Sequence, residues 1–328
     1  MAGMGKRLRP HTLVTPKPLL PIAGKPIVQR LVEDIVRVSH QKVEEIAFIT
    51  GHFGEATEQQ LIAVAEQLGA RGTIHYQEQP LGTAHAILCA ASALEGPITV
   101  AFADTLFRAD FTMDTTVDGV LWVQKISDPR QFGVVIVNSE GIITDFAEKP
   151  AQFVSDLAMI GIYYFVDGAR LKSELQYLVD KNIMNGGEYQ LPDALRNMVA
   201  KGAKFAPGAV SDWMDCGNKD AVLSTNRNIL ENDYPKQPRK NLFQQASTII
   251  EPCYIGDNVK LNHCVIGPFV SLGNDVVVDN CVISDSIVRH GSKITGAVFT
   301  HSMIGSFAEY INNVPSLDLG DYSKKGFA

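Results

Sequence analysis

Residues 3–12 read GMGKRLRPHT and residues 16–26 read PKPLLPIAGKP, which indicates a rigid basic loop near the start of the chain. Residues 1–32 carry six Lys and Arg side chains and no acid, and the first carboxylate is Glu33. Gly3 and Gly5 leave backbone amides open to an anion, and the cations beside them add positive charge. The prolines break the amphipathic helix that a mitochondrial presequence would need. We interpret the segment as a polyphosphate-binding loop; a solvated basic turn is the alternative.

Two common phosphate-binding motifs are excluded by inspection. A Gly-x-Gly-x-x-Gly fingerprint fails because its sixth position is Leu8. A Walker A loop fails because neither Gly-Lys pair is followed by Ser or Thr: Arg7 follows Gly5-Lys6, and Pro26 follows Gly24-Lys25. The sequence therefore supports neither a nicotinamide dehydrogenase nor a P-loop NTPase.

Composition narrows the class of protein further. The 328 residues are 45% hydrophobic and 20% charged, which is typical of a globular chain of about two domains. Lys and Arg total 29 against 36 Asp and Glu, and the net charge of −7 argues against a nucleic-acid partner. No apolar run approaches the ~18 residues of a membrane span, so we expect a cytoplasmic protein without a membrane partner. The five cysteines contain no Cys-x-x-Cys pair, which disfavours a disulfide framework or a zinc site.

Outward from the loop, apolar periodicity predicts an α/β domain. A helix beginning at Pro26 is followed by alternating strands and helices. Such alternation predicts a mainly parallel, doubly wound, Rossmann-like sheet with ligands beyond the carboxyl ends of its strands, where Asp104 falls. The expected strands are 45–50, 73–77, 98–103, 119–124, 133–137 and 160–165, and the expected helices are 55–68, 84–94, 169–179, 191–200 and 220–232.

After residue 232 the pattern changes to a period near six. We predict a first domain over 1–232, a linker over 233–246 and a repeat domain over 247–328. The spacing fits the hexapeptide repeat of a parallel β-helix of about four coils, in preference to an antiparallel meander. The repeating apolar residues are Ile250, Ile255, Leu261, Ile266, Leu272, Val278 and Ile283.

The opening loop belongs to a longer set of motifs that resembles the sugar-1-phosphate nucleotidyltransferases, including long glucose-1-phosphate thymidylyltransferases. The resemblance covers about residues 1–230, and the repeats resemble the left-handed β-helix appended to many members. The motifs, in the order the family shows, are the loop itself, Gln79-Pro80-Leu81-Gly82-Thr83-Ala84-His85-Ala86, Ala103-Asp104, Gly133-Val134-Val135, Glu148-Lys149-Pro150, Gly161, Gly187-Glu188 and Trp213-Met214-Asp215-Cys216-Gly217.

The resemblance implies attack of a sugar 1-phosphate on the α-phosphorus of a nucleoside triphosphate, with pyrophosphate leaving. A phosphate monoester with a second pKa near ~6 is already mostly a dianion, so no general base is needed. Cations and Mg²⁺ are needed instead, to bring two anions together.

Site residues follow from the same resemblance. It implies that Gly3, Gly5, Lys6 and Arg7 hold the triphosphate, and that Lys17 lies beside the α-phosphate and the sugar phosphate. Asp104 and Asp215 would bind Mg²⁺, which takes one or two carboxylates. Gln79 and Gly82 would contact a pyrimidine base. The sugar and its phosphate would be held by Gly133, Glu148, Lys149 and Glu188. Arg7, Lys17, Asp104 and Asp215 are thus the expected catalytic set.

Three departures from the family pattern stand out. The family places a strand before the glycine loop, whereas here the loop is already under way at Met1. That strand is central in a doubly wound sheet, so we expect the natural start to lie upstream, with neighbouring strands otherwise unpaired. Thr105 replaces a common Asn, and Pro192 replaces a common Thr or Ser near the sugar, which leaves the sugar open.

Three functions remain open. We favour thymidylyl or uridylyl transfer to glucose 1-phosphate. A non-catalytic regulatory or scaffolding subunit is the second hypothesis. The third is a bifunctional enzyme with acyltransfer in the β-helix, for which His263, His290 and His301 are the candidate bases. We expect these histidines to be structural or surface residues and the β-helix to support a homo-oligomer.

Overall fold

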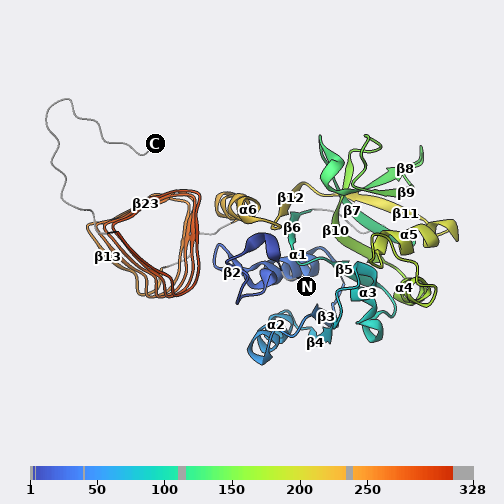
Figure 1. Ribbon diagram of the computed structural model, residues 1–328, viewed down its shortest axis with the longest axis horizontal. Helices are drawn as coiled ribbons and strands as arrows, with labels where there is room; N and C mark the ends of the chain where they lie inside the picture. The colour runs from blue at the N-terminus through green and yellow to red at the C-terminus, as the bar shows by residue number, and fades with distance from the viewer. Residues whose placement is uncertain (1–2, 4, 40, 110–115, 234–238, 313–328) are drawn as a thin grey trace. The chain divides into compact units, whose positions relative to one another are not determined.

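The computed structural model describes residues 3, 5–39, 41–109, 116–233 and 239–312 (Figure 1). The chain divides into two compact units. The first comprises Met1–Leu20 and Lys25–Ala221, and the second comprises Pro21–Gly24 and Val222–Ala328. The division therefore falls inside the helix α6 (Lys219–Asn232).

The first unit is an α/β structure. Its helices are α1 (Ile27–Ser39), α2 (Glu55–Gln67), α3 (Thr83–Leu88), α4 (Gly168–Asp180) and α5 (Leu191–Ala200), with short turns η1 (Lys6–Leu8), η2 (Lys17–Leu19), η3 (Ala91–Ala93) and η4 (Pro129–Gln131). Its strands are β2 (Lys25–Pro26), β3 (Glu45–Thr50), β4 (Arg71–Tyr76), β5 (Ile98–Ala101), β6 (Thr105–Arg108), β7 (Gly119–Lys125), β8 (Gly133–Val137), β9 (Ile143–Glu148), β10 (Leu157–Phe165), β11 (Phe205–Ala209) and β12 (Asp212–Asp215). The predicted α/β class is confirmed, although the predicted helix 84–94 is shorter and ends in a separate turn.

The main sheet has the order β5-β10-β7-β11-β9-β8. It is mixed, and the prediction of a mainly parallel sheet is wrong for it. Strand β10 runs antiparallel to both β5 and β7, β8 and β9 are antiparallel, and only β7 and β11 pair in parallel. The reason is that β8 and β9 are joined too closely for a parallel crossover. A parallel pair, β3 and β4, and an antiparallel ribbon, β6 and β12, form separate sheets.

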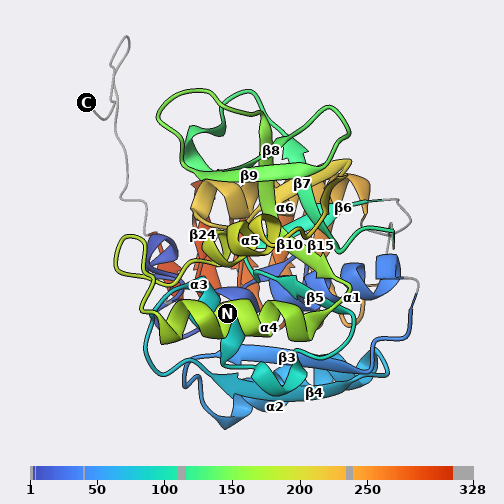
Figure 2. The ribbon, with the colours of Figure 1, turned by 90° about the vertical axis from the view of Figure 1, so that its right-hand side faces the viewer.

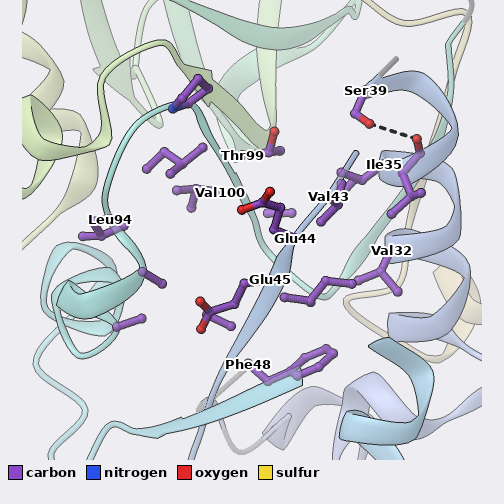
Figure 3. Close-up of a pocket in the computed structure, with 18 of the residues that line it drawn as sticks. Val32, Ile35, Ser39, Val43, Glu44, Glu45, Phe48, Leu94, Thr99 and Val100 are labelled. Atoms are coloured by element: carbon purple, nitrogen blue, oxygen red, sulfur yellow. Dashed lines mark hydrogen bonds between the residues drawn. The ribbon is translucent and has the colours of Figure 1, made fainter. Parts of the chain in front are cut away.

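The sheet is interrupted between β3 and β5. Among the described strands, β3 pairs only with β4, and β5 pairs only with β10. Figure 2 shows β3 and β4 as a layer apart from the six-stranded sheet. The unpaired edges of β3 and β5, strands that both line the pocket of Figure 3, match the expectation that neighbouring strands lack a partner. The expected upstream start of the natural chain stays a prediction.

Apolar stripes place the helices of this unit. Helix α1 follows Pro26 and buries Ile27, Val28, Leu31 and Val32 along one face. The core of the six-stranded sheet contains Phe165 and Phe205, whose rings meet edge to face at 5.9 Å between centroids. No helix in the described ranges is long and apolar enough to cross a membrane.

The second unit carries stacked parallel strands in three sheets, as Figure 1 shows. Hydrogen-bonded side chains in neighbouring coils lie 16 or 17 residues apart. This arrangement is consistent with the predicted left-handed β-helix. Besides β1 (Pro21–Ile22), the strands are β13 (Phe243–Gln245), β14 (Thr248–Ile249), β15 (Cys253–Ile255), β16 (Lys260–Asn262), β17 (Val265–Ile266), β18 (Val270–Leu272), β19 (Val277–Asp279), β20 (Val282–Ile283), β21 (Ile287–Val288), β22 (Lys293–Thr295), β23 (Val298–Phe299), β24 (Met303–Ile304) and β25 (Glu309–Ile311). Strand β13 lies within the range predicted as a linker, of which 234–238 are outside the described residues.

Inward ladders of aliphatic side chains form the core of the coils. Six of the seven repeating residues are buried: Ile255, Leu261, Ile266, Leu272, Val278 and Ile283. The seventh assignment is wrong, because Ile250 is 44% exposed and the preceding Ile249 packs against the core instead. Asn226 of α6 is buried in this unit, where its Oδ1 accepts hydrogen bonds from Ala23 N–H (3.0 Å) and Ser271 Oγ (2.7 Å).

Candidate functional site

The two aspartates expected to bind metal meet at the β6–β12 ribbon of the first unit. Asp104 immediately precedes β6 and Asp215 ends β12, where it pairs in register with Thr105. The Cys216 N–H donates to the Asp104 carbonyl oxygen at 2.9 Å. Burial and the negative charge of Asp104 raise the pKa of Asp215, although a hydrogen bond from the Gly217 N–H (2.9 Å) opposes the shift. The ribbon thus holds two mutually repelling carboxylates side by side.

Lys17 lies against this acidic pair. Its Nζ is 2.7 Å from Asp104 Oδ2, and its side chain is only 13% exposed. The short turn η2, which begins after Pro16, carries the lysine. Gly5 packs against Lys17 with a left-handed backbone (φ +55°), and a Cβ on Gly5 would lie 3.1 Å from the Lys17 Cβ. The Thr12 hydroxyl donates to the Gly5 carbonyl at 2.8 Å. The basic loop is therefore folded onto Lys17.

Arg7 completes the cluster. A Cβ on Gly217 would lie 3.1 Å from Arg7 Nη2 and 3.1 Å from both carboxylate oxygens of Asp215. A side chain at position 217 would therefore crowd the guanidinium and the carboxylate, which would have to shift by a few tenths of an ångström. The positive charges of Lys17 and Arg7 both lower the pKa of Asp215 and partly offset the acidic repulsion. Gly3 and Lys6 lie exposed on the same loop.

Gly82 and Glu188 meet at a second place. Gly82 has φ +104°, and a Cβ there would overlap the Tyr189 carbonyl oxygen and lie 2.9 Å from the Glu188 Cβ. The Tyr189 N–H donates to the Leu81 carbonyl at 2.8 Å, which clamps the two segments together. Gln79, just before them, is exposed. Gly82 and Glu188, which we expect to contact the base and the sugar, therefore lie side by side.

Gly133, Glu148 and Lys149 form a third group at the β8–β9 hairpin. Gly133 pairs in register with Glu148, and a Cβ on Gly133 would lie 2.7 Å from Glu148 Oε2. Lys149 has a left-handed backbone (φ 45°), and its Nζ is 3.8 Å from Glu148 Oε1. Burial raises the pKa of Tyr163, and the charges of Glu148 and Asp104 both add to this shift. Both Glu148 and Asp104 thus add to the effect of burial on this tyrosine.

The donor set fits a hard divalent cation. Asp104 and Asp215 supply two adjacent carboxylates, which is what Mg²⁺ takes from proteins while keeping waters and phosphate oxygens. Within the described part of the chain, no three His, Cys, Asp or Glu side chains gather in a metal-binding group. Burial first, and then the charge of Asp104, raises the pKa of Asp215. The residues present therefore fit Mg²⁺.

Two departures from the family pattern have structural partners. Thr105 is 3% exposed, and its hydroxyl accepts a hydrogen bond from Trp213 Nε1 at 2.7 Å, across the ribbon. Pro192 lies in the first turn of α5, where a missing N–H costs little. Sequence reasoning missed strand β6 and the Gln77 side chain, whose Nε2 donates to the Gly82 carbonyl at 3.0 Å. Gln77, two residues before Gln79, carries no local signal for this role.

The three histidines of the β-helix have separate surroundings. His301 Nδ1 is 3.0 Å from Asp285 Oδ2, and His290 Nδ1 is 3.0 Å from the Asn274 carbonyl oxygen. His263 occupies a left-handed turn position (φ 51°). The three histidines thus have different neighbours, and acyltransfer stays an alternative.

Comparisons with known proteins identify the family of the chain. The sequence model of the Nucleotidyl transferase family matches residues 1–232. The chain is 26% identical to the glucose-1-phosphate thymidylyltransferase of Streptomyces griseus, over 98% of this chain and 96% of the relative. It is 27% identical to the bifunctional protein GlmU of Methanococcus vannielii, over 90% of this chain and 72% of the relative. A structure of UDP-glucose pyrophosphorylase from Acinetobacter baumanii, 22% identical, has the same fold over 71% of this chain and 92% of its own, with a TM-score of 0.57. Because the family match spans well over half of its residues, the chain belongs to the Nucleotidyl transferase family.

Proposed function

We propose that the protein transfers a nucleotidyl group from a nucleoside triphosphate to a sugar 1-phosphate, giving a nucleotide sugar and pyrophosphate. The observation that carries the proposal is the cluster of two cations and two acids, Arg7, Lys17, Asp104 and Asp215. The names of the relatives favour dTTP or UTP as donor and glucose 1-phosphate as acceptor.

The reaction requires neutralisation of negative charge rather than transfer of a proton. A sugar phosphate with a second pKa near ~6 is its own nucleophile at neutral pH. Its attack on the α-phosphorus forms one P–O bond and breaks the bond to the departing pyrophosphate. Lys17 lies between the two reacting anions and reduces their repulsion, while Arg7 stabilises charge that develops on the leaving pyrophosphate. Gly3, Gly5 and Lys6 bind the triphosphate through backbone amides and an ammonium.

Mg²⁺ is the cofactor of the proposed reaction, and Asp104 and Asp215 are the residues that would hold it. When bound, the ion supplies Lewis-acid polarisation of phosphate oxygens. The Lys17 ammonium, which now contacts Asp104, would then be shared between that carboxylate and the incoming phosphate.

Substrate recognition would come from the other two groups of residues. Gln79 and Gly82 read the base, the first by its side-chain amide and the second by its backbone. Glu188, beside Gly82, together with Gly133 and Glu148, holds the sugar hydroxyls. Lys149 binds the phosphate of the sugar.

Assembly and location complete the proposal. The β-helix supports a homo-oligomer, and the enzyme acts in the cytoplasm without a nucleic-acid or membrane partner. The abundance of exposed apolar side chains on the coils, among them Val298 (82%) and Phe307 (70%), favours assembly through this unit.

The test is pyrophosphate release over a matrix of nucleoside triphosphates and sugar 1-phosphates, with Mg²⁺ or with EDTA. We expect metal-dependent turnover for a pyrimidine triphosphate with one sugar phosphate. Lys17→Met should abolish it, whereas the control Lys293→Gln should not, because Lys293 pairs with Glu309 (2.8 Å) on the coils instead. Absence of pyrophosphate release for every substrate pair would contradict the proposal and favour a regulatory subunit. Thiol release from acetyl-CoA would indicate the bifunctional alternative.

A further inference from the structure

A buried asparagine of the second unit joins three distant segments of the chain. Asn226 of α6 is 1% exposed, and its Oδ1 accepts hydrogen bonds from the Ala23 N–H (3.0 Å) and from the hydroxyl of Ser271 in β18 (2.7 Å). Ala23 and Ser271 are themselves buried. Removal of the Asn226 side chain would therefore take the acceptor away from two buried donors, which is costly in a protein interior.

The loop 21–24, which belongs to the same unit, has an unusual backbone at this contact. Ala23 lies in the left-handed region (φ 43°), and so does Gly24 (φ 82°). A Cβ on Gly24 would overlap the ring of Tyr254, so glycine is required at this position. A residue other than glycine stays in the left-handed region only where its surroundings hold it there. Asn226 is the side chain that binds the Ala23 backbone, so we expect it to hold the loop in this conformation.

The loop follows directly on the turn that carries Lys17. Leu20 is fully buried, its N–H donates to the Lys17 carbonyl at 3.0 Å, and its own carbonyl accepts from the Ile27 N–H at 3.1 Å. The next residue is Pro21, the first of the loop. Pro18 and Pro21 have restricted φ angles, so the short stretch between Lys17 and the loop has little freedom to absorb a displacement. A shift of the loop would therefore be passed on to the turn.

Lys17 tolerates little displacement. Its side chain is 13% exposed, and its Nζ lies 2.7 Å from Asp104 Oδ2. In the proposed reaction this ammonium reduces the repulsion between two anions, which it does only from a position close to both. Misplacement of a reacting group by about 1 Å can lower a rate by about 10²-fold.

We infer that Asn226 is a positioning residue for the reaction, which fixes the loop 21–24 and, through the loop, the catalytic Lys17. The inference rests on the proposed function, because that function gives Lys17 its role. The hydrogen bond to Ala23 is the one that carries the effect, whereas the hydrogen bond from Ser271 serves the packing of α6 against β18. An amide suits the position because its oxygen accepts both hydrogen bonds without burying a charge.

The test measures initial rates of pyrophosphate release by the full chain and its variants, with the substrate pair that turns over. Asn226→Leu removes the acceptor at similar volume, so kcat should fall by about tenfold or more. The KM for the nucleoside triphosphate should stay within about twofold, because the proposed triphosphate contacts lie in residues 3–7. Ser271→Ala is the matched control: it removes the other hydrogen bond to the same oxygen, should lower the Tm, and should keep kcat within about twofold. Asn226→Asp keeps the acceptor and should retain kcat within about threefold, although burial of its charge lowers the Tm.

Hydrogen–deuterium exchange gives a readout that does not depend on turnover. In Asn226→Leu, exchange over residues 17–24 should be faster by about tenfold or more, with no change in β9, whereas Ser271→Ala should leave residues 17–24 as in the parent. If the leucine variant does not fold, Asn226→Ser takes its place, because its shorter side chain cannot reach both partners; the same results are expected of it.

Three outcomes would overturn the inference. The first is a folded variant that lacks the acceptor and keeps the kcat of the parent. The second is an equal loss of kcat in Ser271→Ala, which would show a general loss of packing. The third is unchanged exchange over residues 17–24. If no substrate pair gives turnover, the proposed function fails by itself, and the exchange result alone decides whether Asn226 holds the segment that carries Lys17.

Discussion

Replacing Asp215 with asparagine should stabilise the first unit while removing its activity. Burial and the charge of Asp104 make the ionised carboxylate unfavourable in the folded state, as its raised pKa reports. Asparagine keeps the oxygen that accepts the Gly217 N–H at 2.9 Å and carries no charge. We expect removal of this unfavourable charge to add about 0.5–2 kcal/mol to the free energy of unfolding, as single stabilising substitutions commonly do. For a unit of about 200 residues, that corresponds to a rise in Tm of about 1–8 °C.

The assay is scanning calorimetry of the parent and Asp215→Asn at pH 7, with and without Mg²⁺. Mg²⁺ should raise the Tm of the parent and leave the variant unchanged, because a ligand stabilises only the state that binds it. Turnover should fall by about 10²-fold or more. Asp212→Asn, on the same strand, is the matched control: it loses the ion pair with Arg108 and should destabilise by about 0.2–1 kcal/mol.

The stability difference should also depend on pH with a defined sign. The pKa of Asp215 is higher in the folded state than in the unfolded state. The contribution of this group to the free energy of unfolding is therefore fully favourable below the unfolded pKa of about 3.9, and it is lost as pH rises through the folded pKa. The gap in Tm between variant and parent should therefore be largest at neutral pH and shrink on acidification. A variant that is less stable than the parent at pH 7, or a gap that widens on acidification, would refute the reasoning.

Three other substitutions test separate features. Gly82→Ala forces a side chain into φ +104° against the Tyr189 carbonyl, so the free energy of unfolding should fall by about 1–3 kcal/mol and the KM for nucleotide should rise. Urea titration measures the first effect and initial rates measure the second. An unchanged stability and KM would contradict the close approach of the backbone. Thr105→Val leaves the Trp213 indole N–H without its 2.7 Å acceptor and should cost about 1–3 kcal/mol, whereas Thr105→Ser keeps the hydroxyl and should cost less in thermal denaturation. Leu272→Ala empties a fully buried position inside the coils and should lower the free energy of unfolding of the second unit by about 2–5 kcal/mol. Calorimetry measures this loss, and a loss below about 1 kcal/mol would argue against a close-packed interior.

Sequence reasoning located the acids but not the ribbon that joins them. Asp104 was predictable because it follows an apolar strand, and Asp215 because it lies in a dense motif. The pairing of β6 with β12 joins Thr105 to Trp213, 108 positions apart, and no local pattern encodes a contact at that separation. Thr105 departs from the family pattern in sequence, and its hydrogen bond to Trp213 is the structural role that we assign to it.

Periodicity has a similar limit in the β-helix. It predicted the spacing of the inward residues and so the class of fold, but Ile249 and Ile250 are adjacent and equally apolar. Only the register of β14 decides that Ile249 packs inward and that Ile250 is exposed. In the first unit, periodicity found most strands yet could not give their direction, because direction depends on how the chain returns between them.

The β6–β12 ribbon forms a sheet of its own, distinct from the six-stranded sheet and from the β3–β4 pair. Its four register pairs and the Trp213–Thr105 hydrogen bond hold Asp215 at the end of β12 against the start of β6, which Asp104 precedes. The surfaces around Gly82 and Gly133 belong to other segments of the chain. Under the proposed function, substitutions around Gly82 and Gly133 would change which base and which sugar are accepted without altering the pairing of β6 with β12.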